Sequence, residues 1–468
     1  MMNTATEKLP FWRKVTYAVG EVGYAVGPGT IIPFWYTIFL TDIVRLDLRL
    51  VSLFWLIATV WDAVNDPLFG FLSDRTRTRW GRRRPFLLFG AVPFGVSFAL
   101  LWLIPPLESQ ALLFAYYTIV YVIFEAAFTA VSTPYIALTP ELTLDHDERT
   151  SLVTYRMAFN IGSSLAAAIV LALVVFPLFP ARDPQAFRLI GLGGGLLFIP
   201  PFLLAFLGTR ERTEFQVESA PPLLDSFRFV LRNQPFRYTL SLRILAWMPV
   251  VVAQAVFAYF LIYWVGIGES ETSIVQVIIM GMAMLFLPLV LWLSRRLEKK
   301  TAWIIAASTW TVVMLGVLLA PQGLAWPAYL IAALSGFGVS AAHLLPRAME
   351  PDVLEADELM SGRRQEGAYT GVAVFADKLA RAGVMALLPA VLRWSGYIQP
   401  TDADPTPLQP ASALTAVRLL MSLFPTVLLV ASIIVAWRYP ITRRRYAEMR
   451  DELARRRRAA VLPGASEG

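Results

Sequence analysis

The sequence predicts an all-α membrane protein in which twelve transmembrane helices form two six-helix bundles. Hydrophobic residues make up 57% of the 468 residues and charged residues only 16%, whereas about a quarter of the residues in a soluble domain are charged. The apolar residues also gather in long blocks, each close to the roughly 20 residues that a helix needs to cross a bilayer. Basic residues fill alternate connections between these blocks, as in a chain that crosses a membrane repeatedly.

Each apolar block gives one predicted span. The spans are residues 15–40, 50–72, 85–104, 110–138, 152–177, 188–207, 238–264, 271–294, 302–320, 325–346, 367–393 and 412–437. The connections PPLESQ, GIGESET and PQGLAW contain no Lys or Arg, and the basic clusters all fall on the opposite side, together with both ends of the chain. Since basic residues mark the cytoplasmic side, both termini are expected in the cytoplasm. The protein is then a multi-pass protein of the cell (inner) membrane.

The longest cytoplasmic connection divides the chain near its middle. The predicted parts are a first bundle at 1–207, a central loop at 208–237, a second bundle at 238–437 and a basic tail at 438–468. PYIALTPELTLDHDERTSLVTYR after span 4 corresponds to LLPRAMEPDVLEADELMSGRRQEG after span 10. Repeated halves indicate a duplicated transporter whose site lies between the halves near the membrane midplane. The alternative is that such loops recur by chance.

The composition excludes several kinds of site. The chain has no cysteine and only two histidines, so disulfides, iron–sulfur clusters and thiolate zinc sites are ruled out. The net charge of +7 comes from short basic clusters between apolar blocks, which set topology and do not form a nucleic-acid-binding face. We expect no cofactor and no nucleic-acid partner. The expected partners are a small-molecule substrate and membrane lipids, and the protein is expected to be a monomer.

The segment WDAVNDPLFG places two carboxylates inside the second span. Asp62 and Asp66 are i to i+4 and share a helix face, with Asn65 beside them and Pro67 next in the chain. An ionised carboxylate near the bilayer centre costs about 3 kcal/mol or more, so such residues usually have a function. Two carboxylates, an amide and a helix-breaking proline predict an oxygen-lined site for a small hard cation. A proton shared by the two carboxylates is an equally open alternative.

A possible counter-charge lies in the other half. Lys378 on span 11 is about 16 Å from the cytoplasmic end of its helix, nearly the depth of Asp62. Its neighbours Asp377 and Arg381 are i to i+4, so they can pair with each other. Lys378 has a depth similar to that of Asp62, the opposite charge, and a position in the other half of the chain. These three features together favour a functional role for Lys378.

Other charged or polar residues within the spans have two open interpretations. Glu125 and Thr129 are i to i+4 on span 4, and Glu21 lies near the inner end of span 1. Glu125 belongs either to the binding site or to the structural core. Glu21 and Arg381 can instead reach the membrane interface.

The basic loop after span 2 predicts a cytoplasmic gate. Arg77, Arg79 and Arg83 lie between spans 2 and 3, and acidic runs that include Glu141 and Glu358 follow spans 4 and 10. We expect ion pairs between these groups to close the inner side. The alternative is that the arginines only fix the topology.

Classes other than a secondary transporter fit less well. An intramembrane protease needs aspartates on two separate helices, a Ser/His pair or HExxH, and a primary pump needs a GxxxxGK[ST] loop. The chain has none of these arrangements, so we expect it not to be an enzyme. A channel or a receptor on the same scaffold remains an alternative, although binding alone does not require a charge at the midplane.

Several motifs resemble one transporter family. YAVGEVGY, YTIFLTDIV, WDAVNDPLFGFLSDRTRTRWGRRRPF, TPYIALTPELTLDHDERTSL and QEGAYTGVAVFADKLA resemble the glycoside–pentoside–hexuronide:cation symporters. This is the melibiose-permease-like, sodium:galactoside branch of the major facilitator superfamily. The resemblance implies the major facilitator fold and a sodium, lithium or proton site at Asp62, Asn65 and Asp66. It places Thr129 and Lys378 at supporting positions.

The sugar side departs from this family pattern. Family members that bind galactosides have aspartates on spans 1 and 4, where this chain has Ala25 and Ser132. The expected substrate is therefore a sugar, glycoside or uronide other than a typical galactoside, and a basic Arg156 suits an acidic sugar. Because vertebrate lysophospholipid carriers resemble the same family, a lysophospholipid or another amphipathic solute is the alternative. The expected substrate-binding residues are Tyr24, Glu125, Ser132, Arg156 and Tyr369.

Overall fold

The computed structural model describes residues 9–143, 146–210, 232–361, 366–401, 404, 407–446, 448–449, 451–452 and 455. Within these residues the chain is helical, apart from connecting segments and one isolated bridge between Thr78 and Gly81. Most of the predicted central loop and most of the basic tail lie outside the described residues. The all-α class predicted from the sequence is confirmed.

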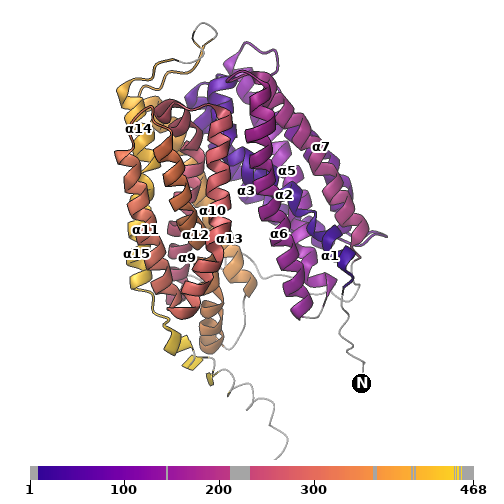
Figure 1. Ribbon diagram of the computed structural model, residues 1–468. Helices are drawn as coiled ribbons and strands as arrows, with labels where there is room; N and C mark the ends of the chain where they lie inside the picture. Colours follow the sequence, from indigo (N-terminus) through magenta and orange to yellow (C-terminus); the bar gives the residue numbers. More distant parts are fainter. Residues whose placement is uncertain are drawn as a thin grey trace, which may run out of the picture. The chain divides into compact units, whose positions relative to one another are not determined.

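The helices follow the predicted apolar blocks (Figure 1). The first part of the chain contains α1 (Phe11–Ala18), α2 (Glu21–Val26), η1 (Gly27–Tyr36), η2 (Phe39–Ile43), α3 (Leu48–Arg75), α4 (Arg84–Leu101), α5 (Gln110–Leu142), α6 (His146–Val170), η3 (Leu171–Val175), η4 (Phe176–Leu178) and α7 (Pro184–Gly208). The later part contains α9 (Gln234–Tyr259), η6 (Phe260–Val265), α10 (Glu269–Arg296), α11 (Lys299–Leu319), α12 (Trp326–Ser361), α13 (Glu366–Trp394), α14 (Ala411–Met421) and α15 (Leu423–Trp437).

Ten helical stretches in the described part of the chain are long and apolar enough to cross a membrane. The predicted spans 15–40 and 367–393 are not among these ten. Residues 11–43 are divided into short α- and π-helical pieces, and α13 carries charges such as Asp377 and Lys378. The membrane-spanning character is established, whereas the count of twelve and the cytoplasmic termini stay predictions.

Glycines in the first predicted span let aromatic rings approach its backbone. A Cβ atom on Gly20 would lie 2.5 Å from the ring of Tyr135 in α5. One on Gly27 would lie 2.6 Å from the ring of Phe198 in α7. The close packing of helices with small residues at the contact is typical of membrane proteins. Here it brings the first span close to α5, where the Tyr135 backbone and hydroxyl and the Thr139 hydroxyl are hydrogen-bonded to Tyr17.

Two helices extend past the predicted ends of their spans. The sequence predicts that spans 4 and 10 end at residues 138 and 346, but α5 continues to Leu142 and α12 to Ser361. The acidic run after span 10 is therefore helical and not a loop. Glu, Ala, Leu and Met in this run have high helix propensity, which the hydropathy pattern alone does not reveal.

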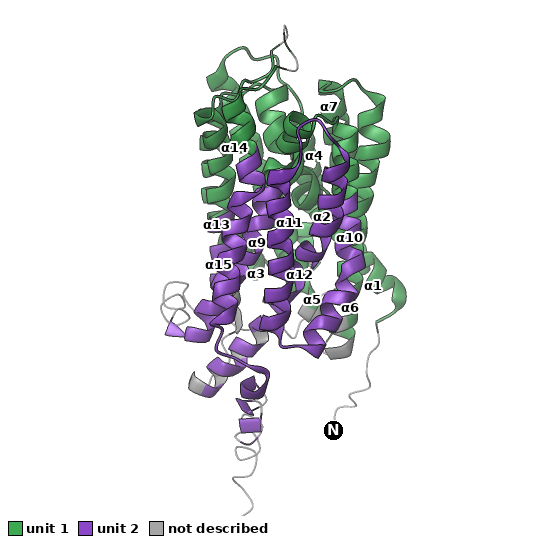
Figure 2. Ribbon diagram, turned by 60° about the vertical axis from the view of Figure 1, so that its left-hand side comes forward, with its two compact units in different colours: residues 1–217, 254–277, 382–417 green, residues 218–253, 278–381, 418–468 purple. Residues whose placement is uncertain are grey.

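The chain forms two compact units (Figure 2). Unit 1 contains residues 1–217, 254–277 and 382–417, and unit 2 contains residues 218–253, 278–381 and 418–468. The predicted boundaries at 207 and 238 stay a prediction. Unit 1 contains segments from both sides of the central loop, whereas the segments of unit 2 all begin within or after it.

Each unit has its own aromatic and apolar core. In unit 1, the rings of Phe94 and Phe198 stack with centroids 5.1 Å apart, which joins α4 to α7. In unit 2, buried Trp303 and Trp310 on α11 pack in a cluster with residues of α12 and α15. Trp303 Nε1 also donates to Ser432 Oγ at 3.2 Å, so the indole nitrogen is satisfied inside the core.

Candidate functional site

The predicted cation-site residues on α3 and α5 come together in unit 1. Asn65 is fully buried, and its Nδ2 donates to the backbone oxygen of Glu125 and to Thr129 Oγ1, both at 2.8 Å. Thr129 Oγ1 in turn donates to Asp66 Oδ1 at 3.4 Å. Trp61 adds a further bond between the two helices, from its Nε1 to the oxygen of Val122 at 3.0 Å. The sequence-predicted grouping of Asn65, Asp66 and Thr129 is therefore present.

The hydrogen bonds fix which way the Asn65 amide points. A backbone carbonyl can only accept, so the amide atom that faces the Glu125 oxygen must be the NH₂ group. The Asn65 Oδ1 atom consequently points away from this contact. It is buried and has no hydrogen-bond partner among the described residues. A buried acceptor without a partner requires an explanation such as a bound ion or water.

The surrounding atoms suit a small hard cation. Asp62 and Asp66 supply carboxylates on the same helix, partly exposed, and Tyr121 on α5 lies within electrostatic range of Asp62 and Glu125. Pro67 has no N–H to donate to the Ala63 carbonyl within the helix, which leaves a further backbone oxygen nearby. Hard cations prefer such oxygen ligands. The donor set therefore fits a transported cation and equally offers carboxylates that can take up a proton.

Lys378 belongs to unit 2, on α13, where it is partly buried. Its neighbour Asp377 pairs with Arg243 of α9, at 2.6 Å between Nη2 and Oδ2. Arg243 Nη1 also forms an ion pair with Glu350 of α12. Thus the pairing of Asp377 with Arg381 that the sequence leaves open is replaced by a three-helix contact centred on Arg243. Arg243 is a charged residue within a predicted span that sequence reasoning overlooked.

Arg156 pairs with Glu21, and both are buried in unit 1. Arg156 Nε donates to Glu21 Oε1 at 2.6 Å, and Nη2 forms an ion pair with the same carboxylate. Arg156 Nη1 donates to Thr139 Oγ1 at 2.9 Å, and Asn160 Nδ2 donates to Glu21 Oε2 at 2.9 Å. The guanidinium also lies 5.0 Å above the ring of Tyr135. Glu21 does not reach the membrane interface, since only 2% of it is exposed.

The two units repeat this arrangement with the charges exchanged. In unit 1, the first span supplies the carboxylate Glu21 and α6 the guanidinium of Arg156. In unit 2, α9 supplies the guanidinium of Arg243 and α13 the carboxylate Asp377. Each arginine also contacts a third residue, which is Thr139 of α5 for Arg156 and Glu350 of α12 for Arg243. Both of these residues directly precede a proline.

A second repeated contact joins the basic segments before α4 and at the start of α11 to α5 and α12, respectively. Arg83 donates to the carbonyl of Ala137, three residues before Pro140, and Lys299 donates at 2.8 Å to the carbonyl of Ala348, three residues before Pro351. Together with the exchanged ion pairs, these equivalent contacts support the internal repeat that the sequence predicts.

The remaining predicted substrate residues lie in different surroundings. Tyr24 is half-buried, with its ring 5.3 Å from that of Phe128, and Ser132 is buried in α5. Tyr369 belongs to unit 2, where its hydroxyl accepts from Asn233 Nδ2 at 2.9 Å and its ring packs against Phe236. This position makes Tyr369 part of a buried packing cluster.

The predicted gate residues are described only in part. Arg77 and Arg79 are exposed, and the Arg79 guanidinium lies 4.3 Å above the ring of Trp80. The side chains of Glu141 and Glu358 lie outside the described residues.

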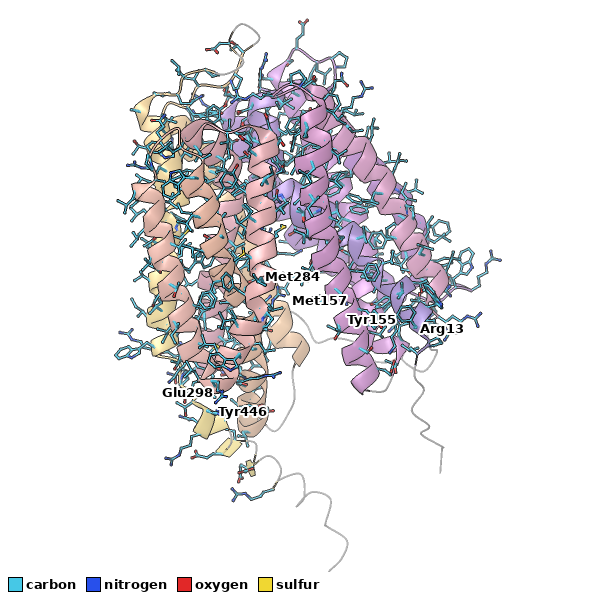
Figure 3. All side chains as sticks on the ribbon, viewed as in Figure 1. Arg13, Tyr155, Met157, Met284, Glu298 and Tyr446 are labelled. Carbon is cyan, nitrogen blue, oxygen red and sulfur yellow. The ribbon has the colours of Figure 1, made fainter. Side chains whose placement is uncertain are left out.

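Other members of the two acidic runs have partners within their own unit. Glu148 pairs with Lys14 at 2.7 Å in unit 1. In unit 2, Asp352 pairs with Lys299 at 2.7 Å, and the Tyr446 hydroxyl donates to Glu355 at 3.2 Å. Figure 3 shows Tyr446 beside Glu298 in unit 2, where Glu298 accepts from the backbone nitrogen of Arg443 at 3.3 Å.

Comparison with known proteins adds a family match over most of the chain. The family described as MFS/sugar transport protein matches residues 16–443. An uncharacterized symporter of Synechocystis is 30% identical, over 97% of this chain and 98% of that protein. The putative glycoside/cation symporter YagG of Escherichia coli is 29% identical, over 94% and 95%. The sodium-dependent lysophosphatidylcholine symporter 1-A of Danio rerio is 26% identical, over 93% and 87%.

Solved structures agree on the fold. A crystal structure of a D-xylose-proton symporter aligns with a TM-score of 0.66 at 15% sequence identity, and the alignment covers 92% of this chain and 98% of that one. At this level of identity the likeness concerns the fold alone.

Proposed function

The chain belongs to the MFS/sugar transport protein family, and from this membership we propose that it is a cation-coupled symporter that works by alternating access. The proposed coupling ion is sodium or a proton. The proposed substrate is a sugar, glycoside or uronide. The family match and the carrier fold make the chain a membrane transporter and not an enzyme.

The observation that carries the proposed coupling is the buried Asn65 Oδ1, which has no hydrogen-bond partner in the described part of the chain. Its amide is held by two hydrogen bonds that Nδ2 donates to α5, so the oxygen cannot turn toward another donor without breaking both. Beside it, Asp66 shares the Thr129 hydroxyl. We assign Asp62, Asn65, Asp66 and Thr129 to the cation site. A cation would replace the missing partner of Oδ1 and offset the charge of the carboxylates.

Lys378 is proposed as the counter-charge of the empty carrier. The basis is its positive charge, opposite to that of the aspartates, and its depth in the predicted span, which is close to that of Asp62. Arg243 anchors the neighbouring Asp377 and so restricts the part of α13 that carries Lys378. A lysine is suited to this role because its ammonium is a compact charge that can be displaced by a cation.

The test of the cation site is stabilisation by the cation. A ligand that binds only the native state at 100 times its Kd stabilises it by about 2.7 kcal/mol. If the ion is sodium, the unfolding temperature of the purified protein should therefore be higher in sodium chloride than in choline chloride. If the ion is a proton, the unfolding temperature should be higher at lower pH. Thr129→Val should reduce this shift. Thr59→Val is the matched control, because the Thr59 hydroxyl donates within its own helix, to Trp55 O. Equal shifts in both variants would count against the site.

The substrate class follows from a screen of the same kind. Sugars, uronides and lysophospholipids are added in turn, each with and without the cation, and coupling predicts that the substrate and the cation stabilise the protein more together than separately. A lysophospholipid is the second candidate. It is supported by the resemblance over most of the chain to a lysophosphatidylcholine symporter, and by Ala25 and Ser132 at positions where galactoside carriers have aspartates.

A further inference from the structure

A buried carboxylate lies at the end of the first helical run of unit 1, outside the cation site. Asp42 in η2 is only 3% exposed. Its Oδ1 accepts from Thr41 Oγ1 at 2.8 Å, and Tyr263 donates to its Oδ2. The Tyr397 hydroxyl lies 2.8 and 2.9 Å from the two carboxylate oxygens and 2.7 Å from the Tyr263 hydroxyl. Tyr259 completes the cluster through Thr41, at 2.6 Å.

This cluster joins segments that are far apart in the sequence. Tyr259 and Tyr263 come from 254–277 and Tyr397 from 382–417, and both segments belong to unit 1 with Asp42. In the predicted topology, these segments are part of the second half of the chain. The cluster therefore connects the two sequence halves within one compact unit.

Further contacts at the same end support this connection. Gln399 Nε2 donates to the backbone oxygens of Thr41 and Leu46 at 2.9 and 2.8 Å. The backbone nitrogen of Arg182 donates to Glu269 at 3.0 Å, and Ser270 Oγ donates to Ala172 O at 2.6 Å. The predicted topology places all these segments on the non-cytoplasmic side, where the connection GIGESET lacks basic residues.

Charged and titratable groups surround Asp42. The Arg182 guanidinium lies 4.9 Å above the ring of Tyr263, and Arg182 and Glu269 line the same small cavity as Asp42. Burial raises the pKa of Asp42, which lies beyond the predicted span 15–40, against the opposing effects of the nearby hydroxyls and Arg182. Burial also raises the pKa of Tyr397 well above its usual value, so this hydroxyl keeps its proton.

We propose that Asp42, Tyr263 and Tyr397 form a latch that holds the two sequence halves together on the non-cytoplasmic side, and that Asp42 binds a proton from that side as the latch closes. The step is a protonation alone: a carboxylate oxygen gains a proton from external water. The proposal rests on the proposed function only in that opening of this side is part of alternating access. It adds a proton site that is separate from Asp62 and Asp66.

The sign of the pH effect follows from linkage. A carboxylate whose pKa is raised in the closed, buried form and ordinary in the open, hydrated form binds its proton more tightly when closed. Lower pH then favours the closed latch. Higher pH leaves a buried ionised carboxylate and favours opening.

Cysteine labelling can measure the open fraction directly, because the chain has no cysteine. The reporter is Ser273→Cys on α10, since Ser273 is fully buried in unit 1. Its reaction with a membrane-impermeant maleimide is compared with that of Ser109→Cys, an exposed position, which corrects for the ionisation of the thiol. All rates are measured without substrate or added sodium, so the result does not depend on transport.

Tyr397→Phe removes the hydroxyl that bonds the Asp42 carboxyl group and should raise the corrected labelling rate about fivefold, as expected for the loss of one hydrogen bond between neutral groups. The matched control is Tyr117→Phe, because the Tyr117 hydroxyl bonds Leu103 O within the first half of the chain, and its rate should stay unchanged. In the parent reporter the corrected rate should rise with pH.

Asp42→Asn mimics the protonated carboxylate and should keep the reporter slow to react at every pH. The proposal is overturned if Tyr397→Phe labels no faster than Tyr117→Phe. It is also overturned if the pH dependence persists in Asp42→Asn. Size-exclusion profiles of all variants identify any that do not fold, and Asp42→Asn, which conserves shape, then decides the result.

Discussion

The buried ion pair of Arg156 and Glu21 gives the sharpest prediction about the structure. In Arg156→Met, the Glu21 carboxylate loses both contacts from the guanidinium and, among the residues that the structure describes, keeps only the bond from Asn160. Because Glu21 is 2% exposed, water cannot replace the lost partner. Removing one member of a buried pair costs about 3–5 kcal/mol, whereas replacing both by apolar residues is often neutral. The double variant Glu21→Met with Arg156→Met should therefore be more stable than Arg156→Met alone.

The free energy of unfolding can be followed by SDS titration in mixed micelles, with the fluorescence of the 14 tryptophans as the signal. The expected result is a loss of about 3–5 kcal/mol in the single variant and a clear recovery in the double one. A loss below about 1 kcal/mol in Arg156→Met, together with a lost response to the substrate, would show that the ion pair does not stabilise the fold. Arg156 would then be a substrate ligand, as the sequence predicts, and not the partner of Glu21.

Two further predictions concern packing and the inner gate. Gly20→Ala should destabilise the protein by about 1–3 kcal/mol through overpacking against Tyr135. Gly70→Ala on α3, where a Cβ meets nothing within 4 Å, should be neutral or slightly stabilising in the same titration, and equal effects would contradict the packing argument. Replacing exposed Arg77 and Arg79 by Gln should change stability by about 0.5 kcal/mol or less but alter the transport rate if they belong to the gate. An unchanged rate in proteoliposomes would leave them with a role in topology only.

The sequence predicts the helical fold well because the apolar core of a bilayer requires apolar helices of a fixed length, and blocks of this length can be recognised in the sequence. The grouping of Asn65, Asp66 and Thr129 also follows from the sequence, since helical spacing and the family resemblance both point to it. The structure adds the orientation of the Asn65 amide, which depends on the Glu125 carbonyl of another helix. Side-chain spacing along one helix cannot give such a contact.

Partners of charged residues were the least predictable feature. Sequence spacing allows Asp377 to pair with Arg381, but the structure pairs it with Arg243, 134 residues away. The same holds for Glu21, whose partner Arg156 lies on α6. These choices depend on which helices pack together. One signal was present: Arg243 lies inside a predicted span, where an arginine is costly unless it is paired.

The most direct test of the proposed cation coupling is accumulation against a gradient. Protein is reconstituted in proteoliposomes with an imposed sodium or proton gradient, and uptake of the substrate identified by the stability screen is measured. Asp66→Asn removes a charge from the cation site and keeps the shape of the side chain. If Asp66 holds the coupling cation, this variant loses uphill accumulation, while downhill exchange, which requires no net movement of the cation, is retained. Accumulation by Asp66→Asn at the level of the unchanged protein would contradict the cation-site assignment.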